Sequence, residues 1–273
     1  MPIGSPQWMY ASGEDFTLDQ SLKFAGGNLS RTPSSAGNRR KWSWSGWVKR
    51  AELGTYQTIW AAKTNTASIF WSPDNILRFE QYNGAGGYNF RRNFNPKMRD
   101  PSAWYHMLFI YDSAQGTETD RNQFYLNGVR QTVEHTYDAM PQNFESEWNN
   151  TEEHYIGNLG SWNYEGYVAE VHFIDGLVKA PADFGETGTY GEWKPIEYEG
   201  TYGTNGFYLP FKQDYTVEGF STVTFTGNSA STQYVGGVGF QPDLVWLKKR
   251  SATQNHNLFD SIRGVTKGIK SNS

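Results

Sequence analysis

The stretch from Trp104 to Val133 constrains the fold more than any other part of the chain. It contains WYHMLFIYD, then a polar loop, then QFYLNGVRQTV with Asn127 and Gly128 at its turn. Asn-Gly is typical of tight hairpins because both turn residues must adopt a positive φ. Apolar residues occupy both faces of the first segment, which is typical of a central strand covered on both sides. The pattern predicts an antiparallel hairpin inside a layered β-structure.

Short segments with a period of two residues follow one another along most of the chain. Strands are predicted at KWSWSGWVKR, TIWAA, SIFWS, ILRFEQY and YEGYVAEVHFIDGLV, while hardly any segment has the helical period of 3.6. The 29 glycines and the aromatic content of 16% fit a turn-rich, aromatic-packed β-protein. The sequence therefore predicts an all-β fold.

Changes in composition divide the chain into four parts. Residues 1–19 are predicted to form an extended arm, with Trp8 and Tyr10 as tether contacts on the same domain or on a neighbouring subunit. The other three parts are a main β domain at 20–185, a glycine-rich surface connector with one strand at 186–215, and a partial second β module at 216–273. The C-terminal end of this last module looks truncated, so we expect a longer protein to continue beyond residue 273.

Charge and cysteine content exclude several classes of protein. With a net charge of −4 and a pI near 5.8, no nucleic-acid partner is expected. The absence of cysteine excludes thiol chemistry and favours synthesis in a reducing cytosol. The first residues do not resemble a signal peptide, and no apolar run reaches the roughly 18 residues of a membrane span. Neither a secretory route nor membrane insertion is therefore expected.

The common catalytic patterns are missing from the sequence. Glycoside hydrolysis requires two carboxylates about 5–9 Å apart across a groove. Glu170 and Asp175 are an odd number of positions apart, which predicts opposite faces of a strand, and Glu145 and Glu147 fall in a predicted loop. No Gly-x-Ser-x-Gly turn is present, and the five histidines are not spaced for zinc. We therefore expect no catalytic residue and no enzymatic activity.

One loop contains residues of the kind that bind calcium. Asp112, Asp120 and Asn122 flank this loop and could supply hard oxygen ligands. A simply solvated loop is the alternative, and no larger metal-binding motif accompanies the three residues. The sequence therefore assigns no cofactor and no metal ligand, with calcium left open at this loop.

Three aromatic residues are candidates for ligand contact. Trp148, Trp162 and Tyr164 are predicted to lie in loops between strands, next to Asn and Glu. An exposed ring suits a sugar because it stacks on the apolar C–H face while neighbouring amides bind the hydroxyls. The alternative is that these rings seal the end of the fold or lie in a subunit interface, where Trp and Tyr are also frequent. Both interpretations stay open.

The order of the predicted strands resembles that of the laminin-G-like, or concanavalin A-like, jelly roll. The resemblance spans residues 20–185 and rests on SLKF, WSWSGWVKR, WYHMLFIYD, FYLNGVR, HYIGN and YEGYVAEVHFIDGLVKAPADF. It implies a sandwich of two curved antiparallel sheets that binds carbohydrate or protein. It does not by itself imply an enzyme, because function depends on the site and not on the fold.

Three further segments, GSPQWMYASG, LSRTPSSAGNRRKWSWSGWVKR and GFQPDLVWLKKRS, are similar to virion proteins of tailed phages. This resemblance implies a non-enzymatic structural protein on the virion surface, as a fibre, spike or capsid decoration, made in the host cytoplasm. Its partners would be other virion proteins, further copies of itself (a trimer is one arrangement) and a host surface glycan. A lectin-like module for host recognition is the alternative, and a glycanase is less favoured.

Overall fold

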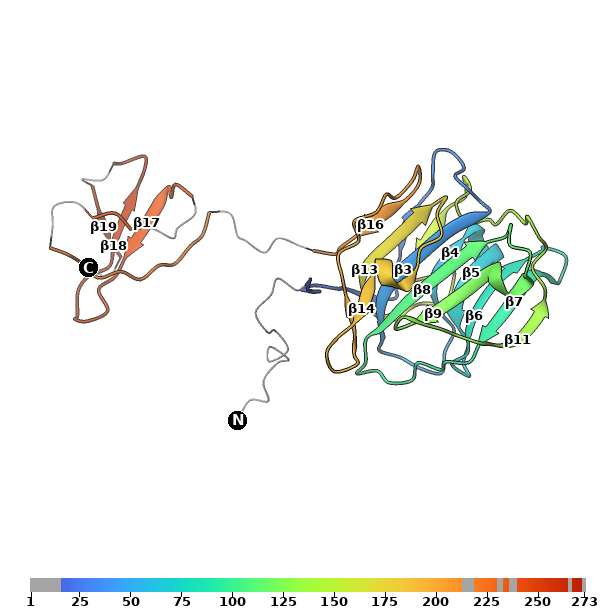
Figure 1. Cartoon of the computed structure of the whole chain (residues 1–273). Helices are drawn as coiled ribbons and strands as arrows, with labels where there is room; N and C mark the ends of the chain where they lie inside the picture. The colour runs from blue at the N-terminus through green and yellow to red at the C-terminus, as the bar shows by residue number, and fades with distance from the viewer. Residues whose placement is uncertain (1–15, 213–218, 230–232, 236–239, 265–266, 272–273) are drawn as a thin grey trace. The chain divides into compact units, whose positions relative to one another are not determined.

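The computed structural model describes residues 16–212, 219–229, 233–235, 240–264 and 267–271 of the chain. The chain forms two compact units, residues 1–212 and residues 213–273 (Figure 1). Within the described ranges, no helix is long and apolar enough to cross a membrane.

The first unit contains two antiparallel sheets of seven strands each. In the first sheet the strand order is β1-β13-β3-β8-β9-β10, and β16 also pairs with β13. The strands of the first sheet are β1 (Leu22–Ala25), β3 (Lys41–Arg50), β8 (Tyr105–Asp112), β9 (Asn122–Leu126), β10 (Val129–Arg130), β13 (Glu165–Asp175) and β16 (Phe207–Leu209).

The second sheet has the strand order β11-β7-β6-β5-β4-β12-β2 and lies against the first (Figure 1). A single helical turn, α1 (Lys63–Thr66), joins β4 to β5. The predicted all-β sandwich is therefore confirmed. The strands of the second sheet are β2 (Leu29–Arg31), β4 (Gln57–Ala62), β5 (Ala67–Trp71), β6 (Leu77–Tyr82), β7 (Tyr88–Phe94), β11 (Val133–Asp138) and β12 (His154–Ile156).

Aromatic side chains fill the space between the two sheets. Trp42 of β3 lies at the centre, where its ring stacks on that of Tyr111 with 5.1 Å between centroids. It also meets Trp60 of the second sheet edge-on at 5.4 Å. Because side chains alternate between the faces of a strand, every second residue of β8, from Met107 to Tyr111, enters this core.

The predicted hairpin lies in the middle of the first sheet. Met107 and Phe109 of β8 belong to the core between the sheets, whereas Leu108 and Ile110 point to the opposite face. On that face they are buried under Phe184. The prediction of a central strand covered on both faces is confirmed, and the outer cover comes from a later part of the chain.

That cover is the segment from Phe184 to Tyr202, most of which belongs to the stretch 186–215 that the sequence indicated to be a surface connector. It contains β14 (Gly185–Thr187) and β15 (Trp193–Pro195), which form a short two-stranded sheet. Tyr198 is buried and stacks on Phe184 at 5.1 Å, and the Trp193 indole N–H donates to Nδ1 of His106 at 3.1 Å. The segment is therefore a layer packed on the first sheet, held by aromatic residues that follow no period.

The Asn-Gly turn has the geometry that its sequence predicts. Asn127 and Gly128, between β9 and β10, have φ values of 48° and 78°. A Cβ atom on Gly128 would lie 2.4 Å from a ring carbon of Trp193. The turn therefore requires glycine both for its backbone conformation and for the approach of the indole.

We expect Gly128→Ala to lower the free energy of unfolding by about 2 kcal/mol. An L-residue in the left-handed region costs about 1–2 kcal/mol, and displacement of Trp193 adds to it. Urea denaturation followed by circular dichroism measures the change. The matched control is Gly116→Ala, because an added Cβ at Gly116 meets no atom within 4 Å. Equal stabilities of the two variants would contradict the expected role of the turn.

The second unit contains a small three-stranded antiparallel sheet. Its strands are β17 (Leu244–Leu247), β18 (Asn257–Asp260) and β19 (Ile269–Lys270), with β18 in the middle. The indole N–H of Trp246 donates to Nδ1 of His256 at 2.8 Å, which links β17 to the loop before β18.

Candidate functional site

Two of the three predicted loop aromatics lie in the core. The Trp148 ring is fully buried and contacts Phe79 edge-on at 5.2 Å. Tyr164 is also fully buried, and its hydroxyl donates to the carbonyl oxygen of Lys49 at 2.9 Å. Burial raises the pKa of Tyr164 above its ordinary value. The prediction of direct glycan contact is therefore wrong for both rings, because apolar side chains of the two sheets enclose them.

Trp162 is the predicted aromatic that is partly exposed. Its ring stacks on Tyr56 with 4.6 Å between centroids and an angle of 14°. Both rings pack on Phe70, at 6.1 Å from Tyr56 and 4.8 Å from Trp162. The predicted tether residues, Trp8 and Tyr10, lie outside the described residues.

The strands of the second sheet place this aromatic group. Phe70 of β5 is the cross-strand partner of Arg78 in β6, which in turn faces Asn93 in β7. These positions alternate with the residues that enter the core, so their side chains point away from it. We call this surface the outer face and define it by Tyr56, Phe70, Arg78, Glu80, Arg91, Asn93 and Trp162.

A fixed ion pair lies next to the aromatic group on the outer face. Nε of Arg91 lies 3.1 Å from a carboxylate oxygen of Glu80, which is only 8% exposed. The Arg91 guanidinium lies between two rings, 4.7 Å from the centroid of Tyr88 and 4.8 Å from that of Tyr137. Burial raises the pKa of the Glu80 carboxyl, and the neighbouring arginines oppose this shift. Arg91 Nε and Glu80 Oε2 make no hydrogen bond within the described part of the chain, so their contact is ionic, and Nη1 of Arg91 donates to the Tyr88 hydroxyl at 2.6 Å.

Arg78 is held less firmly than Arg91. Its guanidinium lies 5.9 Å from the Phe70 ring, and its ion pair with the exposed Asp74 is 3.8 Å long. Nε of Arg78 and Oδ1 of Asn93 are buried and make no hydrogen bond within the described part of the chain. Since buried polar atoms are usually paired, this donor and this acceptor mark an incompletely satisfied place on the face.

The strand residues of the outer face were not among the residues predicted to contact a ligand. The signal was present in ILRFEQY, where Arg78 and Glu80 alternate with the core residues Leu77 and Phe79. Alternation predicts that such polar residues share a surface. It does not show that a loop aromatic such as Trp162, more than 80 positions away, packs beside them.

The loop considered for calcium is held together by ionic contacts instead. Asp112 pairs with Lys41 at 3.4 Å, and Asp120 pairs with Arg130 at 2.6 Å. The side-chain oxygen of Asn122 accepts a hydrogen bond from buried Arg92. Among the residues that the structure describes, no group of three or more His, Asp or Glu side chains is arranged to hold a metal ion.

The carboxylates considered for glycoside hydrolysis have separate partners. Both oxygens of Glu170 accept from the hydroxyl of Tyr208, at 2.8 and 2.7 Å. Asp175 accepts from Asn38 and Asn149 instead. Glu145 and Glu147 form ion pairs with Arg40 and Lys63.

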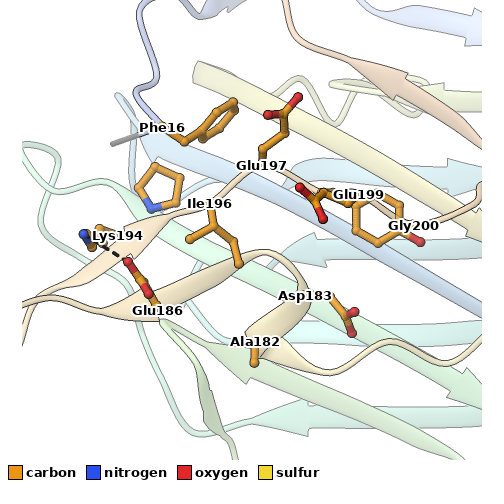
Figure 2. A pocket seen from close by; sticks show the side chains of 11 residues that line it. Phe16, Ala182, Asp183, Glu186, Lys194, Ile196, Glu197, Glu199 and Gly200 are labelled. Atoms are coloured by element: carbon orange, nitrogen blue, oxygen red, sulfur yellow. Dashed lines mark ion pairs between the residues drawn. The ribbon is translucent and has the colours of Figure 1, made fainter. Parts of the chain in front are cut away.

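An acidic hollow of about 530 Å³ lies beside β14 and β15 (Figure 2). Glu186 forms an ion pair with Lys194 at 3.0 Å, and Asp183 accepts from the backbone N–H of Ala180. The other two carboxylates of the hollow belong to Glu197 and Glu199 and are exposed. The catalytic acid of a glycosidase normally lies in a water-poor pocket that keeps its carboxyl group protonated. The carboxylates of this hollow are exposed or already paired, so we do not assign a catalytic pair to them.

Solved structures with similar folds come from several kinds of protein. One is a putative carbohydrate binding protein from Bacteroides ovatus, with 13% identity and a TM-score of 0.45, covering 59% of this chain and 44% of that one. Another is domain 4 of an extracellular arabinanase from Geobacillus stearothermophilus in complex with arabinotriose, with 18% identity, a TM-score of 0.41 and coverages of 62% and 76%. A third is the mouse laminin alpha1 chain, domains LG4-5, with 13% identity and a TM-score of 0.38. This match covers 56% of this chain and 40% of the laminin chain.

With identities and TM-scores this low, these likenesses carry no information on what the chain binds. The chain spans less than half the length of the Bacteroides ovatus protein and of the mouse laminin chain. No significant match occurs among curated protein sequences.

Two family models match the sequence of the chain. One, described as a domain of unknown function, matches residues 216–273. The other, described as the concanavalin A-like lectin/glucanases superfamily, matches residues 24–181, which is more than half of the chain and includes all strands from β2 to β13. The chain therefore belongs to the concanavalin A-like lectin/glucanases superfamily.

Proposed function

We propose that the first unit is a non-enzymatic carbohydrate-binding module and that the outer face is its contact surface. The observation that carries this proposal is the stacked pair of Tyr56 and Trp162 on Phe70, next to the loosely held Arg78. Tyr56 remains 39% exposed, so an aromatic surface is available to the C–H face of a sugar ring. The membership of lectins in the superfamily agrees with this role.

The polar residues of the outer face complement the aromatic pair. A sugar hydroxyl both donates and accepts hydrogen bonds, so it can satisfy the Arg78 donor and the Asn93 acceptor together. Arg78 and Asn93 are cross-strand partners, so the two atoms belong to neighbouring positions of β6 and β7. The Glu80–Arg91 ion pair, with the Arg91 guanidinium against the rings of Tyr88 and Tyr137, lies beside these atoms on the outer face.

A screen of the full chain against a panel of polysaccharides and host-surface glycans tests this proposal. We expect at least one glycan to be retained on an array and in affinity electrophoresis. Incubation with that glycan should release no new reducing ends, because the carboxylates considered for hydrolysis are held by separate partners. Absence of binding across the panel would contradict the carbohydrate-binding role, and turnover would contradict its non-enzymatic nature.

We further propose that the module works on the surface of a tailed-phage virion, as a fibre, spike or capsid decoration. The three sequence segments that resemble such virion proteins support this role. Copies of the chain and other virion proteins would be its assembly partners, and a glycan of the host surface its ligand. Immunogold imaging of particles with antibodies against the chain should label the virion surface, and unlabelled particles would contradict this proposal.

A further inference from the structure

A second cavity, of about 320 Å³, opens between the two sheets at the edge formed by β2, β12 and β16. It does not share a residue with the outer face. Cavities from roughly 300 Å³ upward hold small organic ligands. Its apolar lining comes from both sheets and includes Leu29, Trp60, Ile156, Phe173, Phe207 and Leu209.

The buried polar residues of the cavity are already paired with the protein. Asn149 donates its backbone N–H to Nε2 of His154 at 2.9 Å, and the other ring nitrogen of His154 bonds the carbonyl oxygen of Glu152 at 2.8 Å. Burial lowers the pKa of His154 to about 4, so the imidazole is neutral at pH 7. The side-chain N–H of Asn205 donates to Asn149. The interior therefore presents mostly apolar atoms and no charge.

Arg31 provides the only permanent charge among the residues that line the cavity. Its side chain is exposed, donates to the carbonyl oxygen of Asn205 at 2.9 Å and lies 5.8 Å from the centroid of Phe207. Within the described ranges it forms no ion pair with a carboxylate, and no acidic residue lines the cavity. An arginine has five N–H donors, so most of them remain for a ligand.

We propose that this cavity binds a small monocarboxylate with an apolar tail or ring. The apolar part would enter between Trp60, Phe173 and Leu209, and the carboxylate would meet the guanidinium of Arg31 at the mouth. The planar guanidinium fork matches the two carboxylate oxygens. One positive charge balances a monoanion, which favours a carboxylate over a phosphate dianion. This inference does not depend on glycan binding by the outer face.

Calorimetric titration of the full chain with octanoate and with 1-octanol tests the proposal. The two probes have the same chain length and differ in charge, so at pH 7 octanoate should bind about 10-fold more tightly. Arg31→Gln should remove this preference and leave the affinity for 1-octanol unchanged. Arg99→Gln is the matched control, because Arg99 is exposed and does not line the cavity.

Filling the cavity should abolish the binding of both probes. Leu209→Phe and Leu29→Phe narrow it from opposite sheets, so one variant remains informative if the other does not fold by circular dichroism. The proposal is overturned if octanoate does not bind at millimolar concentration, or if a folded cavity-filling variant binds it as the wild type does. If the wild type and Arg31→Gln bind octanoate with equal affinity, the proposed contact between the carboxylate and Arg31 is contradicted.

Discussion

Replacement of Trp42 by alanine is expected to lower the free energy of unfolding of the first unit by about 3–5 kcal/mol. The Trp42 ring is fully buried between the sheets, where it stacks on Tyr111 and packs against Trp60 and Trp148. Its indole N–H donates to the hydroxyl of Ser146 at 3.2 Å, which would lose its donor. A domain of this kind has only about 5–15 kcal/mol of stability, so the loss is a large share of it.

Urea denaturation followed by far-ultraviolet circular dichroism measures this effect. Trp104→Ala is the control, because Trp104 is 37% exposed and its ring centroid lies 6.5 Å from that of Tyr167. Surface substitutions usually change stability by less than about 0.5 kcal/mol. A loss of less than about 1 kcal/mol for Trp42→Ala would contradict the central position of this ring in the core.

Lowering the pH from 7 to 5 is expected to destabilise the first unit by about 4 kcal/mol. Two buried histidines are responsible. Burial lowers the pKa of His106 to about 3, with a smaller effect from His172, and lowers the pKa of His154 to about 4. Each ring accepts a hydrogen bond from an N–H group, of Trp193 and of Asn149 respectively, so a proton on that nitrogen would break the bond.

The sign of this pH effect follows from the difference in histidine pKa between the folded and the unfolded chain. In the unfolded chain a histidine takes up a proton near pH 6.5, whereas the folded chain keeps both rings neutral down to about pH 4. Stability is therefore fully present above pH 6.5 and falls as the pH decreases, by about 1.4 kcal/mol per pH unit for each histidine. Between pH 6.5 and 5, each histidine contributes about 2 kcal/mol.

Unfolding free energies of histidine variants at pH 7 and pH 5 separate this effect from other titrations. The decrease in unfolding free energy between pH 7 and pH 5 should be about half as large in His154→Gln as in the wild type. His135→Gln should leave it unchanged, because His135 is exposed on β11. A wild-type stability that does not change between pH 7 and pH 5 would contradict the neutral, buried state of the two histidines.

Local patterns predicted much of the scaffold. The alternation in WYHMLFIYD places Leu108 and Phe109 on opposite faces, and the structure buries both. The two-residue turn at Asn127-Gly128 follows from the chemistry of these residues alone. Such features depend on neighbouring residues in the chain, so a sequence pattern contains them.

The candidate site was only partly predictable, because it depends on which segments meet. Trp148 and Trp162 have similar polar neighbours in the sequence, yet Trp148 packs on Phe79 in the core and Trp162 lies over Tyr56 on the outer face. The segment containing Trp193 and Tyr198 shows no period, although it covers the first sheet. Whether these rings are buried depends on contacts between distant segments of the chain, and the alternation of apolar and polar residues does not predict such contacts.

The most direct test of carbohydrate binding by the outer face is the affinity of the retained glycan for Trp162→Ala, measured by calorimetry against the wild type. Loss of a stacked aromatic contact should weaken binding about 10-fold or more. Trp104→Ala removes a partly exposed indole next to the first sheet and should bind the glycan as the wild type does. Weaker binding by Trp162→Ala alone is the predicted result, and equal affinity of all three proteins would contradict the assignment of the outer face.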